Sequence, residues 1–134
     1  MSIQPICKLA FQVTQPELDR FQTFATTALA ARPVYQEPDL AACQLPDGSL
    51  LELYGPSACS PAYLFARGAV VASFRVPNLA LALAQAYAAC LRLVAGPEQV
   101  CPGLCYAHVQ LAKDILIGLY QEDPVPLVDA GLMQ

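Results

Sequence analysis

The sequence predicts an α+β fold made of two tandem βαβββ modules, and two observations support this. First, a strand, a capped helix and further strands follow one another in the first half of the chain, and the same order begins again after residue 68. Second, residues 45–54 align with residues 111–120 at an offset of 66, and Val13 aligns with Val76 at an offset of 63. The chain is therefore expected to be an internal duplication.

The composition is that of one folded domain. Of the 134 residues, 56% are hydrophobic and 13% are charged, which is enough for a core and excludes a disordered chain. A formal net charge of -4 and seven scattered Lys and Arg residues leave no basic patch, so no nucleic-acid partner is expected. Residues 1–8 lack the charged start and apolar run of a secretory signal, and we expect a cytoplasmic protein.

The first module begins with a strand and a helix. Residues 9–13 alternate as a half-buried strand does, and Thr14–Glu17 form a capping box with a proline in the first turn. Apolar side chains then recur at spacings of three and four and form one buried stripe: Leu18, Phe21, Ala25, Ala28 and Leu29. Arg32-Pro33 is expected to end this helix.

Short strands complete the first module. Val34-Tyr35 leads into one run, residues 40–45 form a second, and residues 49–54 form a third. The turn residues Pro46–Gly48 separate the last two runs. Residues 55–68 contain prolines and serines and have the composition of a loop.

The second module repeats this order. Residues 70–76 form a strand, Asn78 is a helix N-cap, and residues 79–94 form a helix that Gly96-Pro97 ends. This apolar helix is too short to cross a membrane and carries Gln85 and Arg92, so no membrane partner is expected. Two further runs, 106–111 and 115–120, are typical of a hairpin.

Six cysteines occur without any CxxC pair, and none is expected in a disulfide framework. We interpret them as reduced core thiols: Cys7, Cys43, Cys59, Cys90, Cys101 and Cys105. The Cys101-x3-Cys105 pair brackets a Pro-Gly turn and leaves a local bridge or half a metal site as alternatives.

With its duplicated modules, the segment LPDGSLLELY at 45–54 and the closing IGLY at 117–120, the sequence resembles the vicinal oxygen chelate superfamily over residues 8–121. That superfamily holds glyoxalase I, extradiol dioxygenases, and fosfomycin- and bleomycin-resistance proteins. The resemblance implies a curved mixed sheet around a concave cavity and a homodimer. It also implies a single domain, 1–134: module one at about 6–55, a linker at 56–68, module two at about 69–122, and a tail at 123–134.

The family's enzymes hold a divalent metal at four positions, which the resemblance transfers to Lys8, Glu52, Val71 and Gly118. Glu52 alone can bind a metal ion, because a lysine ammonium has no free lone pair and the other two residues have no donor. We therefore expect no metal and no cofactor, and expect binding rather than catalysis. A metal-dependent lyase, isomerase or dioxygenase with unusual ligands, such as Glu52 with His108, is the alternative.

Strand alternation predicts which side chains face the cavity, since neighbours on a strand point to opposite faces. Leu9, Phe11 and Val13 are expected to pack on the helix. The opposite face then supplies a ligand pocket: Lys8, Gln12, Gln44, Glu52, Tyr54, Ser73, Arg75, Tyr106, His108 and Tyr120. A sheet face that is simply open to solvent is the alternative.

Three details of this pocket are predicted. The Lys8 ammonium pairs with Glu52, or else extends to water from a strand end. Tyr54 and Tyr120 are equivalent in the two modules and are expected to approach each other across the internal pseudo-twofold axis, either as a clamp for a ligand or as wall-filling core residues. His108 is a hydrogen-bonding pocket group and not a base.

These inferences favour a metal-free dimeric protein that binds a small organic molecule, as the bleomycin-resistance branch does. A structural or interaction protein is a third possibility. The apolar tail 123–134 is expected to pack, either over the pocket or on a partner subunit. Neither the identity nor the charge of the ligand follows from the sequence.

Overall fold

The first strand and helix begin where the local sequence signals predict, but the helix ends before the expected Arg32-Pro33. The chain turns at Ala30, which has a φ of 55°, and Ala28 and Leu29 of the predicted buried stripe are exposed. In the computed structural model, which describes residues 7–123, β1 spans Cys7–Gln12 and α1 spans Gln15–Ala28. The Thr14 hydroxyl accepts a hydrogen bond from the Glu17 backbone at 3.3 Å, and the Glu17 carboxylate accepts one from the Thr14 backbone at 2.9 Å. This reciprocal capping box satisfies two backbone N–H groups that would otherwise lack partners.

The remaining strands of the first module follow in chain order and lead into the second module. They are β2 (Arg32–Glu37), β3 (Leu40–Gln44) and β4 (Leu50–Tyr54). After the loop, β5 (Val70–Arg75) begins the second module. The β3–β4 turn lies at the predicted place, where the Asp47 carboxylate accepts a hydrogen bond from the Ser49 backbone at 2.9 Å.

The second helix is shorter than the sequence predicts. Helix α2 spans Leu79–Ala88 and not 79–94, because the chain turns at Cys90, which has a φ of 67°. The Leu91 backbone N–H donates to the Ala86 carbonyl at 2.9 Å, which closes the helix in a Schellman motif. The sequence signal for this ending was missed because the left-handed position holds a cysteine and not the usual glycine.

The residues after this turn form a strand that the sequence did not predict. Strand β6 spans Arg92–Cys101 and includes Gly96-Pro97, which is therefore not a helix stop. Strands β7 (Leu104–Ala112) and β8 (Ile115–Glu122) form the predicted hairpin. With β6, the second module also has the full βαβββ order.

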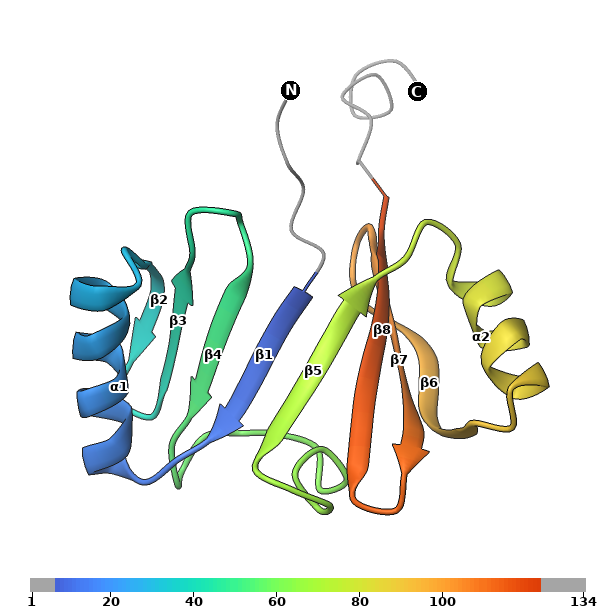
Figure 1. The fold of residues 1–134 in the computed structure, drawn as a ribbon, viewed down its shortest axis with the longest axis horizontal. Helices are drawn as coiled ribbons and strands as arrows, with labels where there is room; N and C mark the ends of the chain where they lie inside the picture. The colour runs from blue at the N-terminus through green and yellow to red at the C-terminus, as the bar shows by residue number, and fades with distance from the viewer. Residues whose placement is uncertain (1–6, 124–134) are drawn as a thin grey trace.

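One open mixed sheet joins the two modules (Figure 1), in the order β2-β3-β4-β1-β5-β8-β7-β6. Strands β1 and β5 pair antiparallel with Leu9 opposite Ala72, its own equivalent in the duplication. Glu52 lies opposite Ala10 in one module, and the equivalent Gly118 lies opposite Ser73 in the other. The predicted α+β duplication is thus confirmed, and a pseudo-twofold axis passes through the β1–β5 joint.

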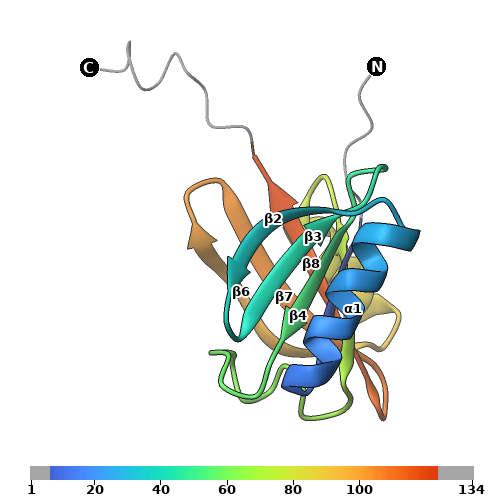
Figure 2. The same ribbon diagram turned by 90° about the vertical axis from the view of Figure 1, so that its left-hand side faces the viewer.

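Each helix covers the outer face of its own module, and α1 packs across the first module in Figure 2. Leu9, Phe11 and Val13 contact buried side chains beneath α1, as the alternation predicts. The opposite face of the sheet carries a separate buried cluster: Ala10, Leu64, Val71 and Leu116. The sheet therefore has one face for its helices and one for a cavity.

The cysteines of the described residues are free thiols, but they are not all in the core. Cys43 is buried, whereas Cys59, Cys90 and Cys101 are exposed. The expectation of core thiols is wrong for these three, because each lies in a loop, at a helix end or on an edge strand. Neither described helix has the length and apolar character needed to span a membrane. The predicted tail falls mainly on residues 124–134, which lie outside the described residues.

Candidate functional site

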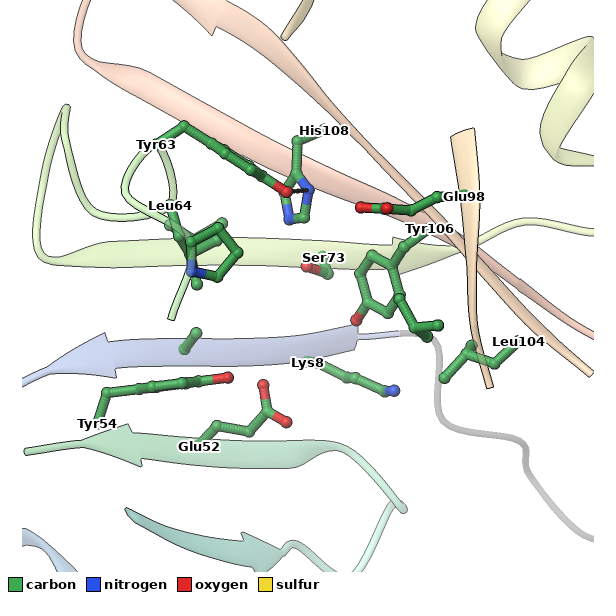
Figure 3. A pocket seen from close by; sticks show the side chains of 14 residues that line it. Lys8, Glu52, Tyr54, Tyr63, Leu64, Ser73, Glu98, Leu104, Tyr106 and His108 are labelled. Carbon is green, nitrogen blue, oxygen red and sulfur yellow. Dashed lines mark hydrogen bonds between the residues drawn. The ribbon is translucent and has the colours of Figure 1, made fainter. Parts of the chain in front are cut away.

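A cavity of about 280 Å³ lies on the concave face of the sheet, over the joint between the modules (Figure 3). Strands of both modules and the β4–β5 loop supply its walls. The lining residues are Lys8, Ala10, Glu52, Tyr54, Pro61, Tyr63, Leu64, Val71, Ser73, Glu98, Val100, Leu104, Tyr106 and His108. Aromatic and aliphatic surface with a few polar groups is typical of a pocket for a small molecule.

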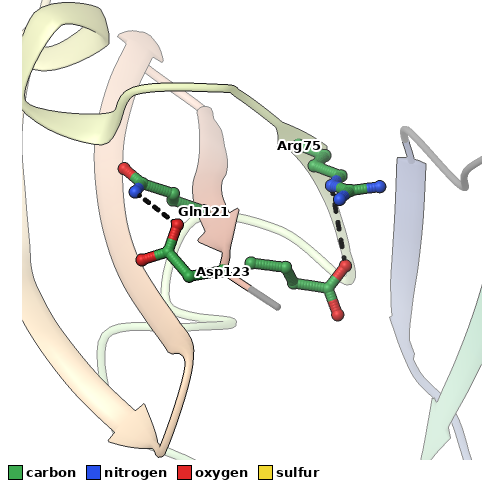
Figure 4. Close-up of polar contacts among 4 residues, drawn as sticks. Arg75, Gln121 and Asp123 are labelled. Atoms are coloured by element: carbon green, nitrogen blue, oxygen red, sulfur yellow. Dashed lines mark hydrogen bonds and ion pairs between the residues drawn. The ribbon is translucent and has the colours of Figure 1, made fainter. Parts of the chain in front are cut away.

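Six of the ten predicted pocket residues line this cavity: Lys8, Glu52, Tyr54, Ser73, Tyr106 and His108. The other four do not. Gln12 lies exposed at the end of β1, and Gln44 is hydrogen-bonded to the Arg32 side chain. Arg75 forms an ion pair with Glu122 at 3.7 Å, as Figure 4 shows beside the Gln121–Asp123 contact. Tyr120 lies beneath Tyr106 and is fully buried.

Eight further residues complete the cavity wall. Ala10 and Val71 share the cavity face of their strands with Lys8 and Ser73. The sequence did not predict the other six, in the β4–β5 loop, on β6 and at the start of β7: Pro61, Tyr63, Leu64, Glu98, Val100 and Leu104. A loop carries no periodicity that would place it, although the apolar run Tyr63-Leu64-Phe65 was a usable signal. Glu98 and Val100 were not predicted, because a helix over residues 79–94 leaves no third strand in the second module.

The Lys8 ammonium lies on the faces of two stacked tyrosines. Its nitrogen is 4.4 Å from the Tyr120 ring centroid and 5.5 Å from that of Tyr106, and the two rings are 5.2 Å apart. Among residues 7–123, it forms no ion pair with Glu52 within 4.0 Å. The predicted Lys8–Glu52 contact is therefore replaced by a cation–π contact.

Glu52 is a half-buried carboxylate on β4. Within the described part of the chain no side chain or backbone group donates a hydrogen bond to it. Burial raises the pKa of Glu52, and the charge of Lys8 opposes this rise. Burial and the Glu52 charge together raise the pKa of Tyr54 to about 12, so the tyrosine next to the carboxylate stays protonated.

His108 lies between two tyrosines at the other side of the cavity. Its Nδ1 is 3.2 Å from the Tyr63 hydroxyl, and its ring is 5.6 Å from the Tyr106 ring in a stacked arrangement. Burial lowers the pKa of His108, so the imidazole is neutral near pH 7. Burial also raises the pKa of Tyr106, and a hydrogen bond with Ser73 opposes that rise.

The position equivalent to Glu52 in the second module has no room for a side chain. A Cβ atom at Gly118 would collide with Ser73 and would lie 3.2 Å from His108 Nε2. Ser73 and His108 thus occupy the space of a second carboxylate. No group of three His, Cys, Asp or Glu side chains suited to a metal ion occurs in residues 7–123. Together with the ammonium of Lys8, this donor set does not fit a catalytic divalent ion.

The two equivalent tyrosines do not meet across the pseudo-twofold axis. Tyr54 packs edge-on against Phe65 at 5.3 Å, whereas Tyr120 stacks on Tyr106. Tyr54 lies opposite Gln12, the last residue of β1, and Tyr120 lies opposite Arg75, the last residue of β5. Since β1 and β5 are antiparallel, these strand ends point in opposite directions, and the expectation of a paired tyrosine wall was wrong.

Comparison with solved structures relates this fold to several others. A glyoxalase/bleomycin resistance protein/dioxygenase superfamily member from Vibrio splendidus is 14% identical, with a TM-score of 0.59 over 87% of this chain and 97% of that one. Methylmalonyl-CoA epimerase from Mycobacterium tuberculosis is 18% identical, with a TM-score of 0.64 over 98% and 95%.

A variant of 4-hydroxymandelate synthase from Streptomyces coelicolor is 9% identical, with a TM-score of 0.66 over 89% of this chain and 49% of that one. The sequence matches no family model and no curated protein. The resemblance that the sequence suggested is confirmed at the level of the fold.

Proposed function

We propose that this chain, which has the fold of the glyoxalase/bleomycin-resistance/dioxygenase structures, binds a small and partly apolar organic molecule in its concave cavity without a metal ion. The observation that carries the proposal is the cavity itself. Tyr54, Tyr63, Leu64 and Val71 give it apolar walls, while Glu52 and the other polar groups are few and spread around it. Its volume of about 280 Å³ suits a small ligand, because pockets for drug-sized molecules start near 300 Å³.

The chemistry of the floor supports binding without a metal. The position equivalent to Glu52 is Gly118, which Ser73 and His108 cover. Lys8 adds a positive charge to the same part of the cavity, on the strands that join the two modules. The Lys8 ammonium supplies positive charge where the family's enzymes hold a metal ion, and it requires no coordinating ligands. Sequestration requires only shape, apolar surface and polar anchors, and the residues of the cavity supply all three.

A homodimer is part of the proposal, and the outer face of α2 supports it. This helix contains no charged residue, and its outward side chains Leu81 and Tyr87 are 54% and 83% exposed. The outer face of α1 instead carries charged residues such as Glu17 and Arg20. An uncharged apolar face fits a second copy of itself, since twofold dimers use the same patch on both subunits.

The test combines metal analysis with ligand binding. Protein purified without chelator is analysed for bound metals, and a library of small organic molecules is screened by ligand-observed NMR with and without EDTA. We expect hits whose binding EDTA does not change. Retention of about one ion per subunit, lost in Glu52→Gln, would instead favour the metal-dependent lyase, isomerase or dioxygenase.

A pair of variants on one strand locates the binding. Leu104 lines the cavity near the start of β7, while Leu111 lies near the end of the same strand and is 49% exposed. Leu104→Trp is expected to weaken the hits by filling the cavity, and Leu111→Trp is expected to leave them unchanged. Hits that both variants bind like the wild type would contradict the proposal.

A further inference from the structure

We propose that the ligand of this cavity is an organic amine, with its protonated nitrogen on Glu52 and a flat apolar body against the tyrosines. This inference rests on the function proposed above and adds the charge and shape of the ligand. The observations behind it are the charges that line the cavity, the partners that these charges already have, and the arrangement of the aromatic rings.

The charges that line the cavity are unequal. Two carboxylates, on Glu52 and Glu98, face one ammonium, on Lys8, and these three are the charged residues among those that line it. The two acids come from different modules, Glu52 from β4 and Glu98 from β6. The cavity thus carries more acidic than basic groups, which favours a cationic over an anionic guest.

The contacts that Lys8 and Glu52 already make strengthen the preference for a cationic ligand. The Lys8 nitrogen already lies 4.4 Å from the Tyr120 ring centroid and 5.5 Å from that of Tyr106. The Glu52 carboxylate, by contrast, receives no hydrogen bond from any residue in the described part of the chain. A half-buried carboxylate has lost part of its water and gains from a donor that reaches it. A positively charged N–H donor supplies the missing hydrogen bond and brings an opposite charge closer than Lys8, which forms no ion pair with Glu52 within 4.0 Å among residues 7–123.

The aromatic rings that line the cavity favour an amine with a flat body. Tyr54 and Tyr63 line the cavity from β4 and from the loop, and Tyr106 lines it from β7 (Figure 3). Tyrosine faces attract cations and stack with flat rings. The Lys8 ammonium on the Tyr106–Tyr120 stack is an example of such a contact within this same molecule.

Three matched probes test the charge preference: tryptamine, neutral tryptophol and anionic indole-3-propionate. Their affinities are measured at pH 7 by NMR titration with the wild-type protein. We expect tryptamine to bind at least tenfold more tightly than the other two. Equal or tighter binding of tryptophol or indole-3-propionate, blocked by Leu104→Trp, would overturn the inference and leave the proposed function standing. Absence of binding by all three probes would overturn the inference alone if the library screen gives other hits, and both proposals if it gives none.

Two substitutions, one that removes a negative charge and one that removes a positive charge, test whether Glu52 is the group that binds the amine. Glu52→Gln is expected to abolish the preference for tryptamine, while Glu37→Gln, which makes the same charge change on the exposed edge strand β2, is expected to keep it. Lys8→Met removes the competing ammonium and is expected to tighten tryptamine binding. If Glu52→Gln does not fold, the Lys8→Met result decides, because weaker tryptamine binding in that variant would contradict the inference.

Discussion

At the scale of single residues, the floor of the cavity separates two charges that could have paired. The Lys8 ammonium contacts tyrosine faces, and the half-buried Glu52 carboxylate has no hydrogen-bond donor among residues 7–123. A cation–π contact keeps the lysine cation at low desolvation cost. The unpaired carboxylate remains available to a ligand, at the expense of stability.

Replacing Glu52 by Gln is expected to stabilise the fold near neutral pH. Burial raises the pKa of Glu52 in the folded chain, so its contribution to stability is fully present below the unfolded pKa and is lost as the pH rises through the folded pKa. The stability advantage of the variant is therefore expected to grow from about pH 4 to neutral pH. Urea unfolding of both proteins at several pH values measures this difference.

Glu17→Gln is the control, because the pKa of Glu17 is shifted in the opposite direction to that of Glu52. Hydrogen bonds from Thr14 lower the pKa of Glu17, so its contribution is present above the unfolded pKa and is lost as the pH falls. The Glu17 variant is expected to be less stable than the wild type at neutral pH and equal to it in acid. A stability difference for Glu52→Gln that does not depend on pH would show that burial does not affect this carboxyl.

Gly118→Ala is expected to destabilise the protein by about 1–3 kcal/mol, because the added methyl group overpacks a filled site. The new Cβ would collide with Ser73 and lie 3.2 Å from His108 Nε2. Gly68→Ala is the matched control, because its Cβ would meet only the Asp114 carbonyl oxygen at 3.7 Å. Thermal unfolding of both variants measures the effect, and equal unfolding temperatures would show that the space over Gly118 is not filled.

At the scale of elements, the end of α2 decides how much of the second module becomes sheet. The Schellman motif at Cys90 stops the helix and sends the following residues into β6. Strand β6 then brings Glu98 and Val100 to the cavity. A helix that continued to Val94, as the apolar spacing suggested, would remove this wall.

Cys90→Gly is expected to stabilise the protein by about 1 kcal/mol. Cys90 has a φ of 67°, and a residue with a Cβ atom pays roughly 1–2 kcal/mol in this left-handed conformation. Ala88→Gly is the control within the same turn, and it is expected to cost about 1 kcal/mol because Ala88 is helical. Urea unfolding measures both, and a destabilised Cys90→Gly variant would mean that the thiol contributes more than the strain costs.

At the scale of the whole molecule, the β1–β5 joint places two modules in one sheet and leaves both helices on the outside. The joint pairs Leu9 with Ala72 and brings the cavity residues of both modules together. It leaves the outer face of α2 without a partner in the described part of the chain, although that face is apolar.

The double variant Leu81→Gln, Tyr87→Gln is expected to convert the proposed dimer into a monomer. Both side chains are exposed on the outer face of α2, so polar replacements remove apolar contact area and leave the core intact. Phe24→Gln is the control, because Phe24 on α1 is also exposed, at 53%. Sedimentation velocity measures the mass; a wild-type monomer, or a dimer that survives the double variant, would refute this interface.

Local sequence signals predicted much of the fold and part of the site. The capping box at Thr14, the N-cap at Asn78 and the alternation of Leu9, Phe11 and Val13 appear in the structure as expected. Alternation works over long distances because a strand keeps its period of two along its whole length. It therefore placed Lys8, Glu52, Tyr54, Ser73, Tyr106 and His108 on the cavity face.

What the sequence by itself determined is the duplication, the helix starts and the face of each strand, since these depend on residues close together in the chain. Tertiary structure alone decided the tyrosine partners of Lys8, the position of Tyr63 beside His108 and the separation of Tyr54 from Tyr120. These depend on which strands pair, in which direction, and on how a loop packs against them. Such contacts join residues far apart in the chain, and no local sequence pattern predicts them.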